Sequence, residues 1–99
     1  MYKIKETNNF SIWLLKLKDI RGKVSIIRRI KRVRLGNFGD CKLLGDHVSE
    51  LRITTGPGYR IYYTQNNNNI ILLLVGGDKS SQNKDIIKAK KMAKEYQDE

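Results

Sequence analysis

Cysteine, proline and histidine are nearly missing from this chain, which has one of each among 99 residues. The single cysteine, Cys41, permits no internal disulfide, and this fits a reducing, cytoplasmic setting. One cysteine and one histidine cannot form a structural zinc site. The sequence also has no Walker motif and no glycine motif for dinucleotide binding. We therefore expect no metal and no cofactor.

Long apolar runs are missing as well. The longest one, residues 70–75, is far too short to cross a bilayer, and the residues after Met1 do not resemble a signal peptide. We therefore expect a cytoplasmic protein with no membrane partner. A length of 99 residues with 39% apolar content suits one compact domain that spans residues 1–99.

Acidic side chains are few, with 10 of them against 20 lysines and arginines, which gives a net charge of +10. Residues 1–35 hold 11 basic and 2 acidic side chains, whereas residues 36–99 are nearly balanced. A field this positive favours a polyanionic partner, nucleic acid first, or an acidic protein. A membrane surface is disfavoured, because the basic helices need their apolar stripes for a core.

Two helices are predicted in the first third of the chain. The first follows a short strand at residues 2–5, and Asn8 or Asn9 caps it. An interruption at residues 19–22 separates it from a second helix that ends at about residue 33. Apolar residues at helical spacing predict the buried faces of the two helices: Phe10, Trp13, Leu14 and Leu17, then Val24, Ile27, Ile30 and Val33.

Three strands and one more helix are predicted in the remainder. Residues 40–46 read as a loop, and an asparagine-rich turn at residues 66–69 joins the last two strands. The strands lie at residues 48–54, 59–65 and 70–75, the last of them a buried central strand that Gly76 and Gly77 end. Ser80 or Ser81 caps the final helix. Its inner face holds Ile86, Ala89, Ala93 and Tyr96, and its outer face Lys84, Lys88 and Lys91.

The predicted order is therefore β-α-α-β-β-β-α. Helices and strands that form separate runs, rather than alternating, indicate an α+β domain. We expect a mainly antiparallel sheet with the two N-terminal helices packed on one face and a C-terminal helix.

The most informative segment is the pair of strands around residues 50–63. Alternation at period two sends Glu50 and Arg52 to the side opposite Leu51. The Gly-Pro-Gly turn at residues 56–58 predicts a hairpin that brings Arg52 and Arg60 together. Two guanidiniums on a rigid surface can grip a phosphate, and a solvated strand face is the alternative interpretation.

Several short strings, taken together and in order, resemble a known family. They are WL and LKD within residues 13–19, RI at 29–30, GNFGD at 36–40, ELRI at 50–53, GPGYRIYY at 56–63 and GGDK at 76–79. With them the chain resembles, over roughly residues 10–93, the addiction-module killer proteins. These are small toxins of the RelE/HigB group within the RelE/ParE superfamily.

The resemblance implies the β-α-α-β-β-β-α fold and a function. RelE/HigB toxins are typically metal-free endoribonucleases that enter the ribosomal A site and cut translated mRNA. The expected partners are the ribosome, mRNA and a cognate antitoxin, which is often a helix-turn-helix protein. Operator DNA is expected to be bound only through the antitoxin. Two alternatives stay open: a DNA gyrase inhibitor of the ParE kind, and a catalytically decayed RNA-binding toxin.

Metal-free RNA cleavage uses the ribose 2′-hydroxyl as nucleophile, so the protein must align the reacting atoms, stabilise phosphoryl charge and move protons. Arg52 and Arg60 suit the charge-stabilising role, and the resemblance places catalytic basic residues of RelE-like toxins at these positions. Lys79 matches the basic residue that such toxins carry at the end of the last strand. The alternative for Lys79 is a solvated lysine beside Asp78.

Three further residues are catalytic candidates. Asp85 lies near the place where relatives carry a catalytic tyrosine or acid, but it can also complement the helix dipole. Glu50 can act as general base or, as we favour, as the salt-bridge partner of Arg52. His47 lies near the start of the Arg52 strand, and a loop histidine is the more common outcome. Because the sequence has only one histidine, a two-histidine mechanism of the pancreatic-ribonuclease kind is excluded.

The RNA-binding candidates lie mainly on the second helix. Its many basic side chains and lack of acids predict contact with the rRNA backbone, whereas a solvated face is the alternative. The residues named for this contact are Arg28, Arg29, Lys31 and Arg32. Tyr62 shares a face with Arg60 and can stack on an unpaired base, although a buried tyrosine is the more common outcome.

Overall fold

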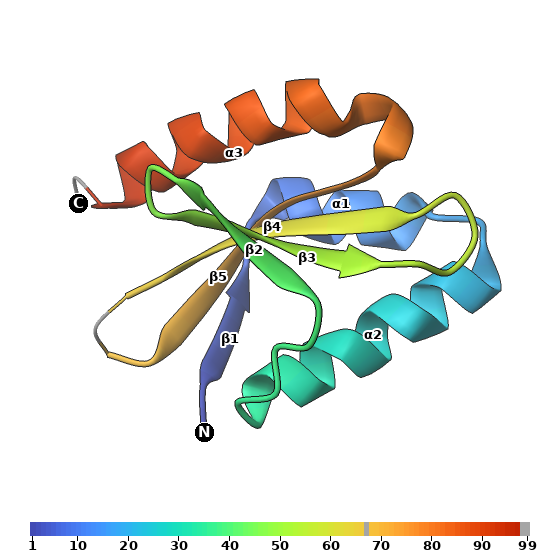
Figure 1. Ribbon diagram of the computed structural model, residues 1–99, viewed down its shortest axis with the longest axis horizontal. Coiled ribbons are helices and arrows are strands. Elements are labelled where there is room, and N and C mark those ends of the chain that lie inside the picture. The colour runs from blue at the N-terminus through green and yellow to red at the C-terminus, as the bar shows by residue number, and fades with distance from the viewer. Residues whose placement is uncertain (67, 98–99) are drawn as a thin grey trace.

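The computed structural model describes residues 1–66 and 68–97, which form a mixed five-stranded sheet with helices on both faces (Figure 1). The predicted α+β class is confirmed. The elements are β1 (Lys3–Glu6), α1 (Asn8–Lys16), α2 (Ile20–Arg34), β2 (Cys41–Gly45), β3 (Val48–Ile53), β4 (Tyr59–Gln65), β5 (Ile70–Asp78), a 3-10 turn (Lys79–Ser81) and α3 (Gln82–Gln97).

The strand order in the sheet is β1-β5-β4-β3-β2. β1 pairs with β5 in parallel, whereas the other three pairings are antiparallel, so the sheet is mixed. β5 lies inside the sheet, as predicted. None of the helices in residues 1–66 and 68–97 has the length and apolar character that crossing a bilayer requires.

One strand was not predicted. Residues 40–46 were expected to be a loop, but β2 pairs antiparallel with β3, beginning with Cys41 opposite Leu51. β2 is an edge strand whose residues are mostly exposed, so it lacks the apolar alternation that marks a half-buried strand. Its pairing partner, rather than its own sequence, makes it a strand.

α1 and α2 cover one face of the sheet and α3 covers the other (Figure 1). On the α2 side, Ile26 is fully buried, whereas Val24 and Ile27, predicted to face the core, are 42% and 40% exposed. The rotation of α2 is explained by Gly22, because a Cβ at this position would overlap the Tyr59 ring. The helix therefore approaches the sheet along Gly22 and Ile26.

The core under α3 contains small helix residues, as the sequence predicted. Ala89 and Ala93 are fully buried and let the helix pack closely on Tyr62 and Leu74. The predicted outer lysines of this helix are exposed.

The predicted cap of α1 was wrong by one or two residues. Thr7, rather than Asn8 or Asn9, caps α1, because its hydroxyl accepts the Phe10 N–H at 3.1 Å and donates to the Leu74 carbonyl at 2.7 Å. This tertiary bond selects Thr7 among the adjacent polar residues. At the other end, Asp78 caps the 3-10 turn and accepts the Ser80 N–H at 2.8 Å, and Ser81, one of the two residues predicted to cap the final helix, directly precedes α3.

β5 does not end at Gly76 and Gly77 but continues to Asp78. A Cβ on Gly76 would overlap the Trp13 ring, and one on Gly77 would overlap the Asp85 carboxylate. The two glycines therefore allow α1 and α3 to approach the strand closely from either face. Of the predicted asparagine turn, Asn67 lies outside the described residues.

Candidate functional site

Arg52 and Arg60 lie directly opposite each other on β3 and β4. Leu51 and Ile61, their neighbours along the strands, are fully buried on the other face of the sheet. The hairpin and the arginine pair are therefore confirmed as predicted. The catalytic role of the two arginines stays a prediction.

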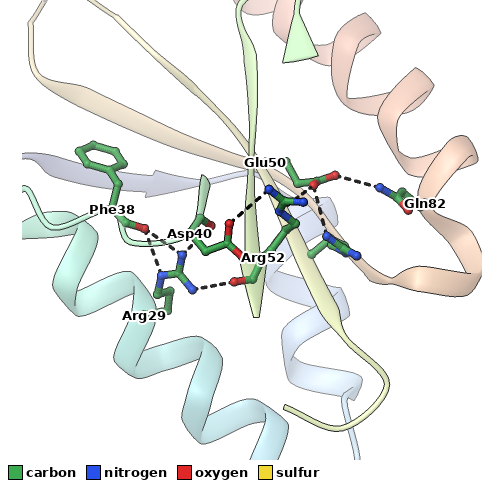
Figure 2. A network of polar contacts seen from close by, with 7 residues as sticks. Arg29, Phe38, Asp40, Glu50, Arg52 and Gln82 are labelled. Atoms are coloured by element: carbon green, nitrogen blue, oxygen red, sulfur yellow. Dashed lines mark hydrogen bonds and ion pairs between the residues drawn. The ribbon is translucent and has the colours of Figure 1, made fainter. Parts of the chain in front are cut away.

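A buried carboxylate holds the two arginines in place. Glu50 is 1% exposed; its Oε1 atom accepts a hydrogen bond from Arg60 Nη1 at 3.3 Å and lies 3.7 Å from Arg52 Nε. Its Oε2 atom accepts from Gln82 Nε2 at 3.2 Å (Figure 2). The interpretation of Glu50 as a salt-bridge partner is thus confirmed, and both carboxylate oxygens are engaged.

Asp40 is a member of the site that the sequence analysis missed. Its Oδ1 atom lies 3.3 Å from Arg52 Nη2, and its backbone carbonyl accepts the Arg52 N–H at 3.0 Å. The signal was present in the register: once residues 41–45 are taken as a strand antiparallel to β3, residue 40 falls opposite residue 52. The loop predicted for residues 40–46 gives no reason to expect Asp40 beside Arg52.

The cationic side chains line one open pocket of about 430 Å³, which we call the cationic pocket. It is bounded by Asp40, Arg52, Ile53, Thr54, Gly56, Pro57, Gly58, Arg60 and Lys79. Lys79 is exposed at the end of β5 and reaches the pocket beside the hairpin turn. Three cations outnumber the two carboxylates that pair with the arginines, Asp40 and the buried Glu50, so the pocket can bind a phosphate group through charge-assisted hydrogen bonds.

Two catalytic candidates do not reach the cationic pocket. Asp85 lies against Gly77, where its Oδ2 atom accepts the Ser81 hydroxyl at 2.6 Å. His47 lies in the turn before β3, at the far end of the strand from Arg52, roughly 16 Å away for five extended residues. It lines a separate pocket of about 530 Å³ with lysines of α3.

Tyr62 is fully buried between the sheet and α3, so it cannot stack on a base in this conformation. Burial, followed by the negative charges of Glu50 and Asp85, raises the pKa of its phenol far above the usual value. The interpretation as a buried tyrosine is the correct one. Within residues 1–66 and 68–97, its hydroxyl has no hydrogen-bond partner.

The basic residues of α2 divide into two kinds. Arg28, Lys31 and Arg32 are exposed, as predicted, and Arg28 and Arg32 line a groove of about 320 Å³ that also includes Asp40 and Arg52. Arg29 instead turns toward the sheet, where its guanidinium donates to backbone carbonyls (Figure 2). The exposed side chains remain available to a polyanion, whereas Arg29 is engaged within the protein.

Candidate metal ligands are not gathered anywhere in the part of the chain that the structure describes. No three side chains of histidine, cysteine, aspartate or glutamate lie together there in a way that could hold an ion.

No family model matches the chain. The chain is similar to a protein of Haemophilus influenzae (strain ATCC 51907 / DSM 11121 / KW20 / Rd) that is described as an uncharacterized protein. The two sequences are 52% identical over 92 residues, which cover 93% of each.

Proposed function

We propose that this chain, which belongs to the same family as the Haemophilus influenzae protein, is the toxin of a type II toxin–antitoxin module. In this proposal it is a metal-free, ribosome-dependent endoribonuclease that cuts mRNA and stops translation. The observation that carries the proposal is the cationic pocket, where Arg52, Arg60 and Lys79 meet. The resemblance to RelE/HigB toxins supports it, with the fold taken as RelE-like and β2 as an addition to the predicted order.

In the proposed reaction the RNA supplies both the nucleophile and the leaving group. The 2′-oxygen forms a bond to the adjacent phosphorus, and the bond from phosphorus to the 5′-oxygen breaks. The 2′-hydroxyl loses its proton to a base, and the 5′-oxygen gains one. A cyclic 2′,3′-phosphate and a 5′-hydroxyl result.

Arg52 and Arg60 bind the phosphoryl oxygens and stabilise the charge that develops on them. Glu50 keeps the two guanidiniums oriented, so little reorganisation accompanies the reaction. Lys79, which is exposed, supplies a third positive charge at the rim of the pocket. None of the three remaining candidates is assigned proton transfer. Asp85 accepts from Ser81 outside the pocket, and both carboxylate oxygens of Glu50 are engaged by neighbouring side chains. His47 lies too far from the pocket.

The proposed partners follow from the charge distribution. Arg28, Lys31 and Arg32 form an exposed basic surface on α2 that contacts the rRNA backbone while mRNA enters the pocket. The cognate antitoxin, a helix-turn-helix protein that also binds operator DNA, neutralises the toxin by covering or distorting this surface. No membrane partner is proposed.

Primer extension on an mRNA translated in the presence of the purified chain tests the proposal. Cuts within codons, absent with the Arg52→Ala variant and absent from untranslated mRNA, are the expected result. Breaks in DNA with intact mRNA would indicate the gyrase inhibitor instead. Binding to ribosomes without cuts in mRNA would indicate the catalytically decayed toxin.

A further inference from the structure

Arg29 links two segments of the chain that each carry a residue of the cationic pocket. Its Nε and Nη2 atoms donate to the Phe38 carbonyl at 3.2 and 2.9 Å, and Nη2 also donates to the Asp40 carbonyl at 2.7 Å. Its Nη1 atom donates to the Arg52 carbonyl at 2.7 Å (Figure 2). One side chain of α2 thus fixes the loop before β2 and the end of β3 together.

The local sequence is built for this contact. Gly39, at φ +64°, lies between the two loop residues that accept from Arg29, and a Cβ there would come within 3.0 Å of Arg29 Nη2. A planar guanidinium presents its donors in a fixed fork, which suits several carbonyls in different directions. A lysine ammonium at this position cannot reproduce that geometry.

The backbone carbonyls that Arg29 holds belong in part to Asp40 and Arg52, which both line the cationic pocket. Asp40 and Arg52 project from the two segments that Arg29 joins, and their side chains pair at 3.3 Å. Asp40 is 54% exposed on its side chain, so little besides this backbone anchor and Arg52 itself keeps its carboxylate in place.

We propose that Arg29 is a positioning residue: it holds Asp40 against Arg52 and so fixes the Arg52 guanidinium in the cationic pocket, rather than contacting RNA. The inference rests on the proposed function for its effect on catalysis. Without Arg29, the Phe38 carbonyl loses its donor and the Asp40 carbonyl keeps only the bond from the Arg52 N–H. The Asp40 carboxylate then turns to solvent, and Arg52 pairs with Glu50 alone. The guanidinium then leaves the orientation in which it stabilises the transition state.

Cleavage kinetics separate positioning from RNA contact. Arg29→Lys keeps the charge, and we expect it to lower kcat by about 100-fold with KM nearly unchanged, because a misplaced group costs that much. Arg34→Lys, at an exposed position on the same helix, is the matched control and should change neither constant. A rise in KM with kcat unchanged in Arg29→Lys would overturn the proposal.

A double-mutant cycle tests the route through Asp40. If Arg29 acts on Arg52 through Asp40, the Arg29→Lys change should have little further effect on kcat in an Asp40→Asn background. Full additivity of the two losses would show that Arg29 acts by some other route, and the proposal would fail.

A measurement without activity keeps this inference separate from the proposed function. The Arg52 Nε–H signal is followed by NMR in the folded protein while inorganic phosphate is added. Arg29→Lys and Asp40→Asn should each shift this signal and alter its response to added phosphate, whereas Arg34→Lys should do neither. An unmoved Arg52 signal in Asp40→Asn, which replaces an exposed side chain, or in folded Arg29→Lys would overturn the proposal even if wild-type protein cuts no mRNA.

Discussion

Two arginines that face each other across a hairpin repel, and like charges directly opposite destabilise a sheet. Glu50 offsets this repulsion between Arg52 and Arg60 from a position that is 1% exposed. A buried carboxylate is tolerated only when it is paired and hydrogen-bonded, and Glu50 meets both conditions with Arg60, Arg52 and Gln82. Stability and the proposed phosphate binding therefore depend on the same few side chains.

The two arginines should differ in what their removal costs. Arg60→Ala leaves buried Glu50 without its closest cation and should lower the free energy of unfolding by about 3 kcal/mol. Arg52 is 39% exposed on its side chain against 12% for Arg60, so Arg52→Ala should cost less than about 1 kcal/mol. Urea denaturation of both variants measures the difference.

The Arg60 side chain is only 12% exposed but belongs to neither apolar core, so its removal should not unfold the domain. Both alanine variants should abolish growth arrest in cells while remaining folded by circular dichroism. Equal unfolding free energies for the two variants would contradict the central position of Glu50 beside Arg60.

Tyr59 and Asp19 form a second coupled pair, in which the phenol donates to Asp19 Oδ2 at 2.7 Å. Burial and then this bond raise the pKa of Tyr59 to about 12. The unfolded phenol ionises near 10, so stability from the neutral phenol should be lost as the pH rises from 10 to 12. The same bond lowers the pKa of Asp19 below 3.8, so its contribution should be lost as the pH falls below that value.

Tyr59→Phe should flatten the dependence of stability on pH at both ends. Urea midpoints at pH 3, 8 and 11 measure this; the alkaline loss should shrink by on the order of 1 kcal/mol. Tyr62 and Tyr63, whose pKa values are also raised, keep the remaining alkaline loss. An unchanged slope in the variant would show that the Tyr59–Asp19 bond does not contribute.

The packing of both helical layers on β5 requires two residues without side chains, Gly76 and Gly77. Gly76 lies under the Trp13 ring and Gly77 under Asp85, so both helical layers approach the strand at adjacent residues. Glycine normally weakens a strand, and here it marks a close approach instead. The end of β5 also leads directly to Lys79, so this packing sets the rim of the cationic pocket.

Gly76→Ala should lower the free energy of unfolding by about 3 kcal/mol, because the rigid Trp13 ring cannot move away from a Cβ without repacking. Gly45→Ala is the matched control. It has φ +87° and no atom within 4 Å of its Cβ position, so only backbone strain of about 1 kcal/mol is expected. Equal losses in guanidinium denaturation would contradict the overlap with Trp13.

In the molecule as a whole, part of the positive charge of the first 35 residues lies beside the site. The groove lined by Arg28 and Arg32 shares Asp40 and Arg52 with the cationic pocket. A polyanion on α2 can therefore reach the pocket across this shared lining. α3 lies on the opposite face of the sheet (Figure 1).

Removing charge from α2 should change how binding depends on salt. Lys31→Ala combined with Arg32→Ala should weaken ribosome binding and reduce the slope of log affinity against log salt by about 1 to 2. Lys88→Ala combined with Lys91→Ala removes the same charge from α3 and should leave the slope nearly unchanged. Binding measured from low to high salt decides between local contact and net charge; equal slopes for the two variants would refute the contact on α2.

Much of the fold could be predicted because periodicity reports burial. The hairpin strands, the apolar β5 and the alanine face of α3 each carry a regular pattern, and the structure confirms them. β2, the rotation of α2 and the cap of α1 could not be predicted, because each depends on a partner distant in sequence. β2 pairs with β3 at Leu51, and α2 is rotated so that Gly22 lies against the Tyr59 ring. The cap of α1 is Thr7, whose hydroxyl donates to the Leu74 carbonyl.

For the candidate site, the strand pattern was enough to pair Arg52 with Arg60 and to place Glu50 beside them. The pattern could not predict that Asp40 and Arg29 belong to the site. Both are held there by hydrogen bonds to backbone carbonyls, which every residue has, so no residue type marks them. Spacing along one strand also cannot tell its two ends apart, which is why His47 was grouped with Arg52.

The charge of this protein, its α+β class and the face on which its central arginines lie can all be read from its amino acids. Those properties follow from residue type and from the period of two along a strand, which no distant contact alters. Which charged groups are free and which are engaged depends instead on the folded arrangement. Burial of Glu50, inward rotation of Arg29 and enclosure of Tyr62 depend on how α2 and α3 pack against the sheet, and packing is a property of the assembled chain.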